Sequence, residues 1–351
     1  MKARRAVLIT ASVLVIGTAA WPAASARAAT AGAASATPLP AHVYVPYYET
    51  YLAPNTPSIT ATAQASGVKY FTLAFLQASA KGSCSIDWNS NSGQPLNYYN
   101  SDIASLRALG GDVIPSFGGY SADHGGTEIA DACTSVSQIA ADYEQVITTL
   151  GVTRLDMDVE SSSLNNTAGI ARRNQAIAMT EAWAKANGIP LQIQYTLPVE
   201  QYGLDPNGEA VLKSAVTNGA AVTSVNVMAF DYYISGEGVV NMGQAAINAA
   251  SNTHTQLASI FPSLTAAQLW NMEAITLMPG IDDYPKKTEV TSVADAQTVL
   301  SFGQANGLNL LTIWAIQRDN GGCPGSRGQN TCSGIAQNTW DFSHTLNPFT
   351  A

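Results

Sequence analysis

The stretch Leu155-Asp156-Met157-Asp158-Val159-Glu160 decides the fold that the sequence predicts. Its three carboxylates occupy every second position, and apolar residues stand between them. Alternate residues of a β-strand share one face, so a strand here points all three carboxylates to the same place. A solvated acidic edge strand is the alternative. The apolar residues on the opposite face favour an interior strand with a second buried layer behind it.

Three like charges on one strand face repel one another. At least one of these carboxyl groups is therefore expected to be protonated or strongly hydrogen-bonded. Titratable groups held in such a state concentrate at functional sites. The pattern consequently predicts a functional site at the end of this strand.

The N-terminus carries the pattern of a secretory signal over residues 1–28. A basic start at Lys2, Arg4 and Arg5 precedes an apolar run too short for a comfortable membrane span, and Ala26-Arg27-Ala28 fits a cleavage site. A membrane anchor is the alternative interpretation. The Ala/Thr/Pro-rich residues 29–40 are expected to form a disordered leader. Residues 41–351 contain no internal Pro- or Ser-rich linker, which predicts one domain. The signal pattern predicts that this protein is secreted and extracellular.

Charge and composition narrow the class of ligand. Removal of the signal leaves 12 of the 16 Lys and Arg against all 25 Asp and Glu, a formal charge of −13. This acidic balance argues against nucleic acid and against anionic membranes as partners. The low charged fraction, 12%, and the many hydroxyl and amide side chains suit neutral polar ligands.

The four cysteines are Cys84, Cys133, Cys323 and Cys332, and an even count in an exported chain predicts two disulfides. Three pairings are open. Cys323–Cys332 would close a short Gly-rich loop, and Cys84–Cys133 then follows. A zinc site is the competing interpretation, but it lacks a C-x-x-C pair and a nearby histidine.

Apolar runs and helical stretches alternate along the rest of the chain. Strands are predicted at 42–48, 69–75, 112–117, 155–160, 189–197, 223–230, 274–278 and 308–316. Helices are predicted at 103–109, 136–150, 170–187, 208–217, 242–260 and 293–305. Eight strands alternating with helices predict an α/β fold, a single (β/α)8 TIM barrel. Active sites of such barrels lie at the C-terminal strand ends, where Glu160, Asp231 and Trp314 fall.

Several of these strand ends carry motifs that resemble glycoside hydrolase family 18, the chitinase family. The family's D-G-x-D-x-D-x-E stands as Thr153 to Glu160, with Thr153-Arg154 in place of Asp-Gly. Its S-x-G-G stands as Ser116 to Gly119, and its M-x-[YFM]-D as Met228 to Asp231. Its strand-eight tryptophan stands as Trp314. The matches run in order from Val45 to Asp319.

The resemblance implies a retaining, substrate-assisted hydrolysis of β-1,4-linked N-acetylglucosamine, a known exception to the two-carboxylate scheme. Glu160 would be the general acid and base, with a pKa raised by crowding from the two aspartates. Asp158 would hold the acetamido group of the sugar, and Asp156 would share a proton with Asp158. Trp314 would form the floor beneath the reacting sugar. The further substrate-binding residues expected are Asp231, Tyr232, Gln194, Tyr195 and Met228.

Three functions remain open from the sequence: a chitinase, an endo-acting enzyme on other N-acetylhexosamine glycans, and a non-catalytic glycan-binding barrel. The expected ligands are chitin or N-acetylglucosamine oligosaccharides, bound by a monomer without cofactor or metal. The exposed aromatics expected near the cleft are Tyr47, Tyr48, Trp88 and Tyr120. Asp282 and Asp283 are interpreted as loop acids outside the catalytic set.

Overall fold

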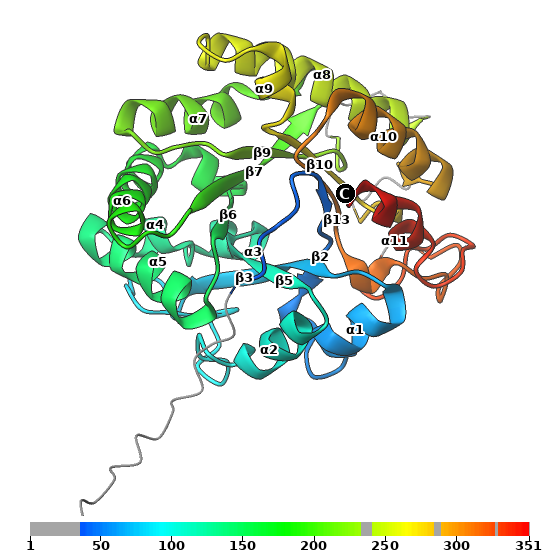
Figure 1. Ribbon diagram of the computed structural model, residues 1–351, viewed down its shortest axis with the longest axis horizontal. Coiled ribbons are helices and arrows are strands. Elements are labelled where there is room, and N and C mark those ends of the chain that lie inside the picture. Colours follow the sequence, from blue (N-terminus) through cyan, green and yellow to red (C-terminus); the bar gives the residue numbers. More distant parts are fainter. Residues whose placement is uncertain (1–35, 233–240, 284–288, 327–328, 351) are drawn as a thin grey trace, which may run out of the picture. The chain divides into compact units, whose positions relative to one another are not determined.

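A parallel sheet closes on itself through the first strand segment of the chain, as seen in the computed structural model (Figure 1). This segment is interrupted at Val45-Pro46 into β1 (Val43–Tyr44) and β2 (Tyr47–Glu49). β1 pairs with the last strand, β13 (Leu310–Ile313), and β2 pairs with β3 (Tyr70–Ala78). One continuous segment thus joins both ends of the sheet and completes a barrel. The structure describes residues 36–232, 241–283, 289–326 and 329–350.

The other barrel strands follow in chain order, each parallel to its neighbours. They are β5 (Asp112–Gly118), β6 (Arg154–Asp158), β7 (Gln192–Glu200), β9 (Ser224–Met228) and β10 (Glu273–Leu277). Short antiparallel additions are β4 (Ile86–Trp88) on β3, β8 (Gly203–Leu204) on β7, and the pair β11 (Gly280–Ile281) and β12 (Val290–Thr291). The predicted (β/α)8 barrel is confirmed.

Helices form a ring outside the strands (Figure 1). The longer ones are α1 (Ile59–Ser66), α2 (Asn100–Ala108), α5 (Val136–Leu150), α6 (Thr167–Ala186), α7 (Pro206–Asn218), α8 (Met242–Ile260) and α10 (Val293–Asn306). Shorter ones are α3 (Tyr120–Gly125), α4 (Ile129–Ala132), α9 (Ala266–Trp270) and α11 (Asp341–Leu346), with 3₁₀ turns η1 (Thr50–Leu52), η2 (Ser161–Asn165), η3 (Ile316–Arg318) and η4 (Asn347–Phe349). None of the described helices is long and apolar enough to cross a membrane.

Side-chain caps define where several of these helices begin. The hydroxyl of Ser58 accepts from Ala61 N, and that of Ser135 accepts from Gln138 N. Ser292 and Asp295 form a reciprocal capping box at the start of α10. Each cap satisfies backbone N–H groups that have no partner within the helix, so these boundaries follow from local sequence.

Strand alternation separates two cores. Leu155, Met157 and Val159 lie in the large apolar layer between the barrel and its helices, as predicted. A smaller cluster, which includes Val43 and Leu310, fills the barrel interior at its N-terminal end. Arg154 is also buried near this end and donates to Gln192 Oε1 and Asn309 Oδ1, so its described partners are amide oxygens rather than an acid.

The expected disordered leader, 29–40, is partly ordered. Thr37 N donates to Asp112 Oδ2 at 2.6 Å, and Leu39 packs on the cluster at the N-terminal end of the barrel. Apolar burial therefore begins before residue 41. The predicted signal, 1–28, lies outside the described residues. The structure joins Cys84 to Cys133 and Cys323 to Cys332, the pairing that the sequence favoured.

Candidate active site

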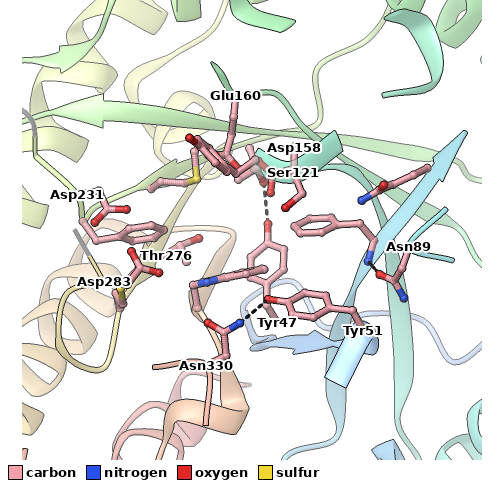
Figure 2. Close-up of a pocket in the computed structure, with 18 residues that line it drawn as sticks. Tyr47, Tyr51, Asn89, Ser121, Asp158, Glu160, Asp231, Thr276, Asp283 and Asn330 are labelled. Atoms are coloured by element: carbon pink, nitrogen blue, oxygen red, sulfur yellow. Dashed lines mark hydrogen bonds between the residues drawn. The ribbon is translucent and has the colours of Figure 1, made fainter. Parts of the chain in front are cut away.

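A cavity of about 730 Å³ opens at the C-terminal ends of the barrel strands. Figure 2 shows Asp231 and Asp283 on one side of it, Tyr51 and Asn89 on the other, and Glu160 and Asp158 between them. The lining residues come from nearly every barrel strand or the loop behind it: Tyr47, Tyr51, Phe75, Gln77, Asn89, Tyr120, Ser121, Asp158, Glu160, Thr196, Met228, Phe230, Asp231, Thr276, Met278, Asp283, Trp314 and Asn330. The site is therefore built by tertiary structure from most of the chain.

Glu160 is half-buried in this cavity, two residues beyond the end of β6. Burial raises the pKa of its carboxyl group to about 7, and the negative charge of Asp283 acts in the same direction. A backbone hydrogen bond with Tyr120 opposes the rise. The expected cause was crowding by Asp156 and Asp158. In the structure burial comes first, because the side chain leaves the strand and lies in the wall of the cavity.

Asp156 lies fully buried inside the barrel and collects hydrogen bonds from four side chains. The donors are Ser116 Oγ at 2.6 Å, Thr196 Oγ1 at 2.7 Å, Tyr47 Oη at 2.9 Å and Gln194 Nε2 at 3.0 Å. Burial raises the pKa of Asp156, and these hydrogen bonds pull it back down. Four donors converging on one carboxyl group are suited to an ionised carboxylate.

Asp158 is also buried, but its carboxyl group receives fewer hydrogen bonds from the protein than that of Asp156. Its Oδ1 atom has no hydrogen-bond partner among the described residues. Burial and the negative charges of Glu160, Asp156 and Asp123 hold its pKa well above the ordinary range. The geometry therefore puts the proton of this carboxyl pair on Asp158 and the charge on Asp156.

Trp314 forms an aromatic floor at the centre of the cavity. Its ring stacks on Phe75 at 5.5 Å and 19°, and it meets the edge of Tyr47 at 5.4 Å. Met228, Phe230 and Met278 form an apolar cluster against the same indole. Because the ring is only half-buried, the apolar C–H face of a sugar can stack on it.

The two glycines of Ser116-Phe117-Gly118-Gly119 create the space for this arrangement. A Cβ on Gly118 would lie 2.0 Å from the carbonyl oxygen of Asp158, and one on Gly119 would lie 2.4 Å from the Phe75 ring. Both residues also have positive φ, at 97° and 81°, which glycine adopts readily. The motif thus allows close packing of β5 against the end of β6.

Asp231 lines the cavity beside two other acids. Its backbone N–H donates to Asp282 Oδ2 at 2.9 Å. Burial, together with a hydrogen bond between the Asp231 and Asp282 side chains, raises the pKa of Asp231 to about 11. Carboxylate oxygens of Asp231, Asp282 and Asp283 come within 4.8 Å of one another, close enough to hold a cation. The positive charge of Arg318 acts on the same group.

Three of the expected binding residues do not reach the cavity. Tyr195 is 0% exposed, and its hydroxyl donates to Asn174 Oδ1 of α6 at 2.8 Å, so its ring lies outside the barrel. Gln194 lies inside the barrel, beneath the cavity, against Asp156. Tyr232 is buried and its N–H donates to Glu289 Oε2 at 3.1 Å. Met228, Asp231 and Trp314 do line the cavity.

Exposure of the aromatic residues also differs from expectation. Tyr47, Tyr48 and Trp88 are buried, whereas Tyr120 is 61% exposed and stacks on His124. Tyr47 lines the cavity as expected, but its hydroxyl belongs to the network beneath Trp314, where it contacts Asp156, Thr196 and Asn226. Strand alternation could have indicated that Thr196 and Asn226 face inward, since each of these polar residues stands between outward-facing apolar neighbours.

The cavity also receives residues that no sequence motif indicated. Asn330, from the loop that Cys323–Cys332 closes, donates through Nδ2 to the Tyr51 hydroxyl at 3.1 Å (Figure 2). Tyr51 in turn donates to Glu49. Asp283, interpreted from the sequence as a loop acid, lies at the cavity wall. These contacts join loops that are about 280 residues apart in the chain.

The known proteins that this chain resembles include several named as chitinases. No family profile matches the chain. It is 33% identical over 287 residues to the "probable bifunctional chitinase/lysozyme" of Escherichia coli K12, covering 80% of this chain and 31% of that protein. It is 33% identical over 291 residues to "endochitinase 11" of Metarhizium anisopliae, covering 80% and 53%. The chain thus spans about a third and about half of these curated relatives.

Among solved structures, active domain 2 of the chitinase from Pyrococcus furiosus superposes with a TM-score of 0.78 at 26% identity, covering 90% of this chain and 97% of that one. A second structure of that domain, complexed with chito-oligosaccharides, gives 0.77 at 26% identity, covering 90% and 96%. A family 18 chitinase of Flavobacterium johnsoniae shares the fold at 9% identity, with a TM-score of 0.55, covering 88% and 94%.

Proposed function

The chain belongs to glycoside hydrolase family 18, the chitinase family, and we propose that it cleaves β-1,4-linked N-acetylglucosamine chains with retention of configuration. The observation that carries this proposal is the half-buried Glu160, with its raised pKa, in a cavity floored by Trp314 above a carboxyl pair. A carboxyl group with a pKa of about 7 is protonated often enough near neutral pH to act as an acid and ionised often enough to act as a base.

Bond cleavage begins with proton transfer from Glu160 to the oxygen of the leaving sugar. The acetamido oxygen of the sugar on the Trp314 side attacks the anomeric carbon, and the bond to the leaving oxygen breaks. A cyclic oxazolinium ion results, so no enzyme carboxylate is needed as nucleophile. Glu160, now ionised, takes a proton from a water molecule. The oxygen of that water attacks the anomeric carbon from the face that the leaving group vacated, and the bond from this carbon to the acetamido oxygen breaks. Two inversions give net retention.

Asp158 is proposed to orient the acetamido group by accepting its N–H and to balance the positive charge of the oxazolinium ion. For this it releases the proton that it holds in the free protein. Asp156 can take that proton, because the hydroxyls of Ser116, Tyr47 and Thr196 can each turn from donor to acceptor. The hydrogen bonds around Asp156 can thus rearrange when the proton moves between Asp158 and Asp156.

Export from the cell is part of the proposal. The predicted signal at residues 1–28 and the two disulfides support it, since disulfides persist in oxidising compartments. Polymeric N-acetylglucosamine is too large to enter a cell, so an extracellular location also suits the proposed substrate.

The test is turnover of N-acetylglucosamine oligomers of two to six units, with product lengths and anomers followed by chromatography and NMR. Glu160→Gln removes the proton but keeps the shape, and should reduce kcat by at least about 10²–10⁴-fold. Glu144→Gln, on the outer helix α5, is the matched control and should act like the wild type.

The same assays separate the alternatives. Full activity of Glu160→Gln would refute the assignment of the acid. Binding without turnover by the wild-type protein would select a non-catalytic glycan-binding barrel. Turnover of N-linked glycans in preference to the oligomers would select an endo-acting enzyme on other N-acetylhexosamine glycans.

A further inference from the structure

The chain turns sharply just after the proposed acid. Glu160 is extended, with φ −132° and ψ −179°, and η2 begins at the next residue. Ser161 has a φ of 44°, in the left-handed region that a residue with a side chain seldom adopts. Such a conformation persists only where surrounding contacts hold it. The place of the Glu160 carboxyl group depends on this turn, so whatever holds the turn also aims the acid.

Asp123 of α3 contacts both sides of the turn. Its carboxylate oxygen Oδ2 accepts a hydrogen bond from the backbone N–H of Glu160. Its backbone carbonyl accepts from the hydroxyl of Ser162 at 2.7 Å. One residue therefore fastens the positions before and after Ser161. Asp123 is 1% exposed, so water does not compete for the bond that it makes with the Glu160 amide.

The helix that carries Asp123 is itself anchored to the end of β6. Gly119 N, at its start, donates to the carbonyl oxygen of Asp158 at 3.2 Å, and Asp123 N donates to Gly119 O at 3.0 Å. A backbone hydrogen bond with Tyr120, the first residue of α3, reaches the Glu160 carboxyl group. The helix thus connects to Asp158, to the Glu160 main chain and to the Glu160 side chain.

Burying a fourth carboxyl group beside Asp158 and Glu160 is unfavourable unless other groups compensate it. Behind Asp123 lies the buried ion pair of Arg173 Nη2 and Glu128 Oε2, at 3.0 Å. The positive charge of Arg173 acts on Asp123 and opposes the repulsion from Glu128 and Glu160. A buried acid retained in so acidic a neighbourhood is explained by the hydrogen bond that it accepts.

We propose that Asp123 is a positioning residue that fixes the main chain of Glu160 and thereby sets the place of its carboxyl group in the cavity. This inference rests on the proposed role of Glu160 as acid and base. A displacement of a reacting group by about 1 Å can reduce the rate about 10²-fold. Asp123 does not line the cavity, so it acts on turnover and leaves substrate binding largely unchanged.

Two substitutions separate the hydrogen bond from the rest of the side chain. Asp123→Ala removes the acceptor and should lower kcat by about 10- to 100-fold while KM for a fluorogenic N,N′-diacetylchitobioside changes by less than about threefold. Asp123→Asn keeps an acceptor oxygen for the Glu160 amide and should restore kcat to within about threefold of the wild type. Asp142→Asn, a buried acid of α5 away from the cavity, is the control for loss of any buried carboxylate and should leave kcat unchanged.

Rescue of kcat by the asparagine variant is the decisive result. If Asp123 had only a general structural role, kcat would not depend on whether the side chain at position 123 can accept a hydrogen bond from the Glu160 amide. The inference is overturned if Asp123→Ala keeps kcat within threefold of the wild type, or if the alanine and asparagine variants lose it equally. If Asp123→Ala does not fold, Ser162→Ala tests the other half of the contact at an exposed position. It should lower kcat about threefold, and an unchanged kcat there overturns the inference.

Glu160→Gln is assayed in the same series. If that variant stays active, the proposed function fails. If it is inactive while Asp123→Ala is not impaired, only the positioning role fails.

Discussion

Replacing Tyr47 by Phe removes one hydroxyl from the interior of the barrel and leaves the ring in place. That hydroxyl donates to Asp156 Oδ2 at 2.9 Å, lies 2.9 Å from Thr196 Oγ1 and accepts from Asn226 Nδ2 at 3.3 Å. The ring remains beside Trp314, since the edge contact at 5.4 Å does not involve the hydroxyl. The substitution therefore perturbs the charge on Asp156 with little change in packing.

The expected size follows from the loss of one of four donors to a buried carboxylate. A hydrogen bond to a charged group contributes about 1.5–3 kcal/mol. At 1.36 kcal/mol per pKa unit, this loss raises the pKa of Asp156 by about one to two further units. The folded protein then holds the charged form less well, and the free energy of unfolding falls by about the same 1.5–3 kcal/mol wherever Asp156 is ionised.

The sign determines the pH at which this loss is visible. The pKa of Asp156 in the folded protein is already raised, so ionisation of this group destabilises the fold as pH rises through that value. The variant should show the larger loss at the higher pH, where more of Asp156 is ionised. At low pH more of the carboxyl group is protonated in both proteins, and the difference should shrink toward the ~0.5–1.5 kcal/mol of a neutral hydrogen bond.

Urea unfolding at pH 8 and pH 4 measures both values. Tyr143→Phe is the matched control, because the Tyr143 hydroxyl is buried without a hydrogen-bond partner among the described residues. That variant should change the free energy of unfolding by less than about 0.5 kcal/mol at either pH. An equal loss at both pH values in Tyr47→Phe, or a loss no larger than that of Tyr143→Phe, would refute the assignment of charge to Asp156.

The remaining predictions concern the cavity. The rate, as kcat/KM, should fall about tenfold per pH unit above about pH 7 as Glu160 loses the proton that it must donate. Asp283→Asn removes a negative charge that raises this pKa, so it should move the alkaline limb to lower pH; a limb that stays in place would contradict the role of Asp283. Trp314→Ala removes the sugar platform and two aromatic contacts worth about 0.5–1.5 kcal/mol each, and should lower kcat/KM at least about tenfold. Trp314→Phe should retain more activity, and equal losses in both variants would argue against stacking.

Local sequence was sufficient for the barrel and for the order of its parts. The alternation in 155–160 and the caps at Ser58 and Ser135 act over a few residues, and the structure follows them. Buried parallel strands also need apolar residues on their outer face, which the sequence displays directly. The carboxylate triplet and Trp314 were therefore predictable as residues of the cavity and of the network beneath it.

Other residues could not be assigned from local patterns. Tyr195 faces the helices, because strand alternation places it on the side opposite to Gln194. Tyr232 follows the motif residue Asp231, but the path of the loop buries it beside Glu289. Tyr47 looked like an exposed aromatic, but its neighbours across the barrel give its hydroxyl three partners. Contacts over more than a hundred residues leave no local sequence signal.

The stretch from Leu155 to Glu160 shows the same difference between local and long-range information. Local alternation is enough to show that Asp156, Asp158 and Glu160 emerge on one side of a buried strand, because side chains alternate along extended backbone. Their different protonation states and positions depend on residues that are distant in the chain. Four donors from other strands keep charge on Asp156, the lack of such donors leaves the proton on Asp158, and the turn fastened by Asp123 carries Glu160 into the cavity. The pKa of a carboxyl group depends on the groups that surround it in space, and here these come from the whole barrel.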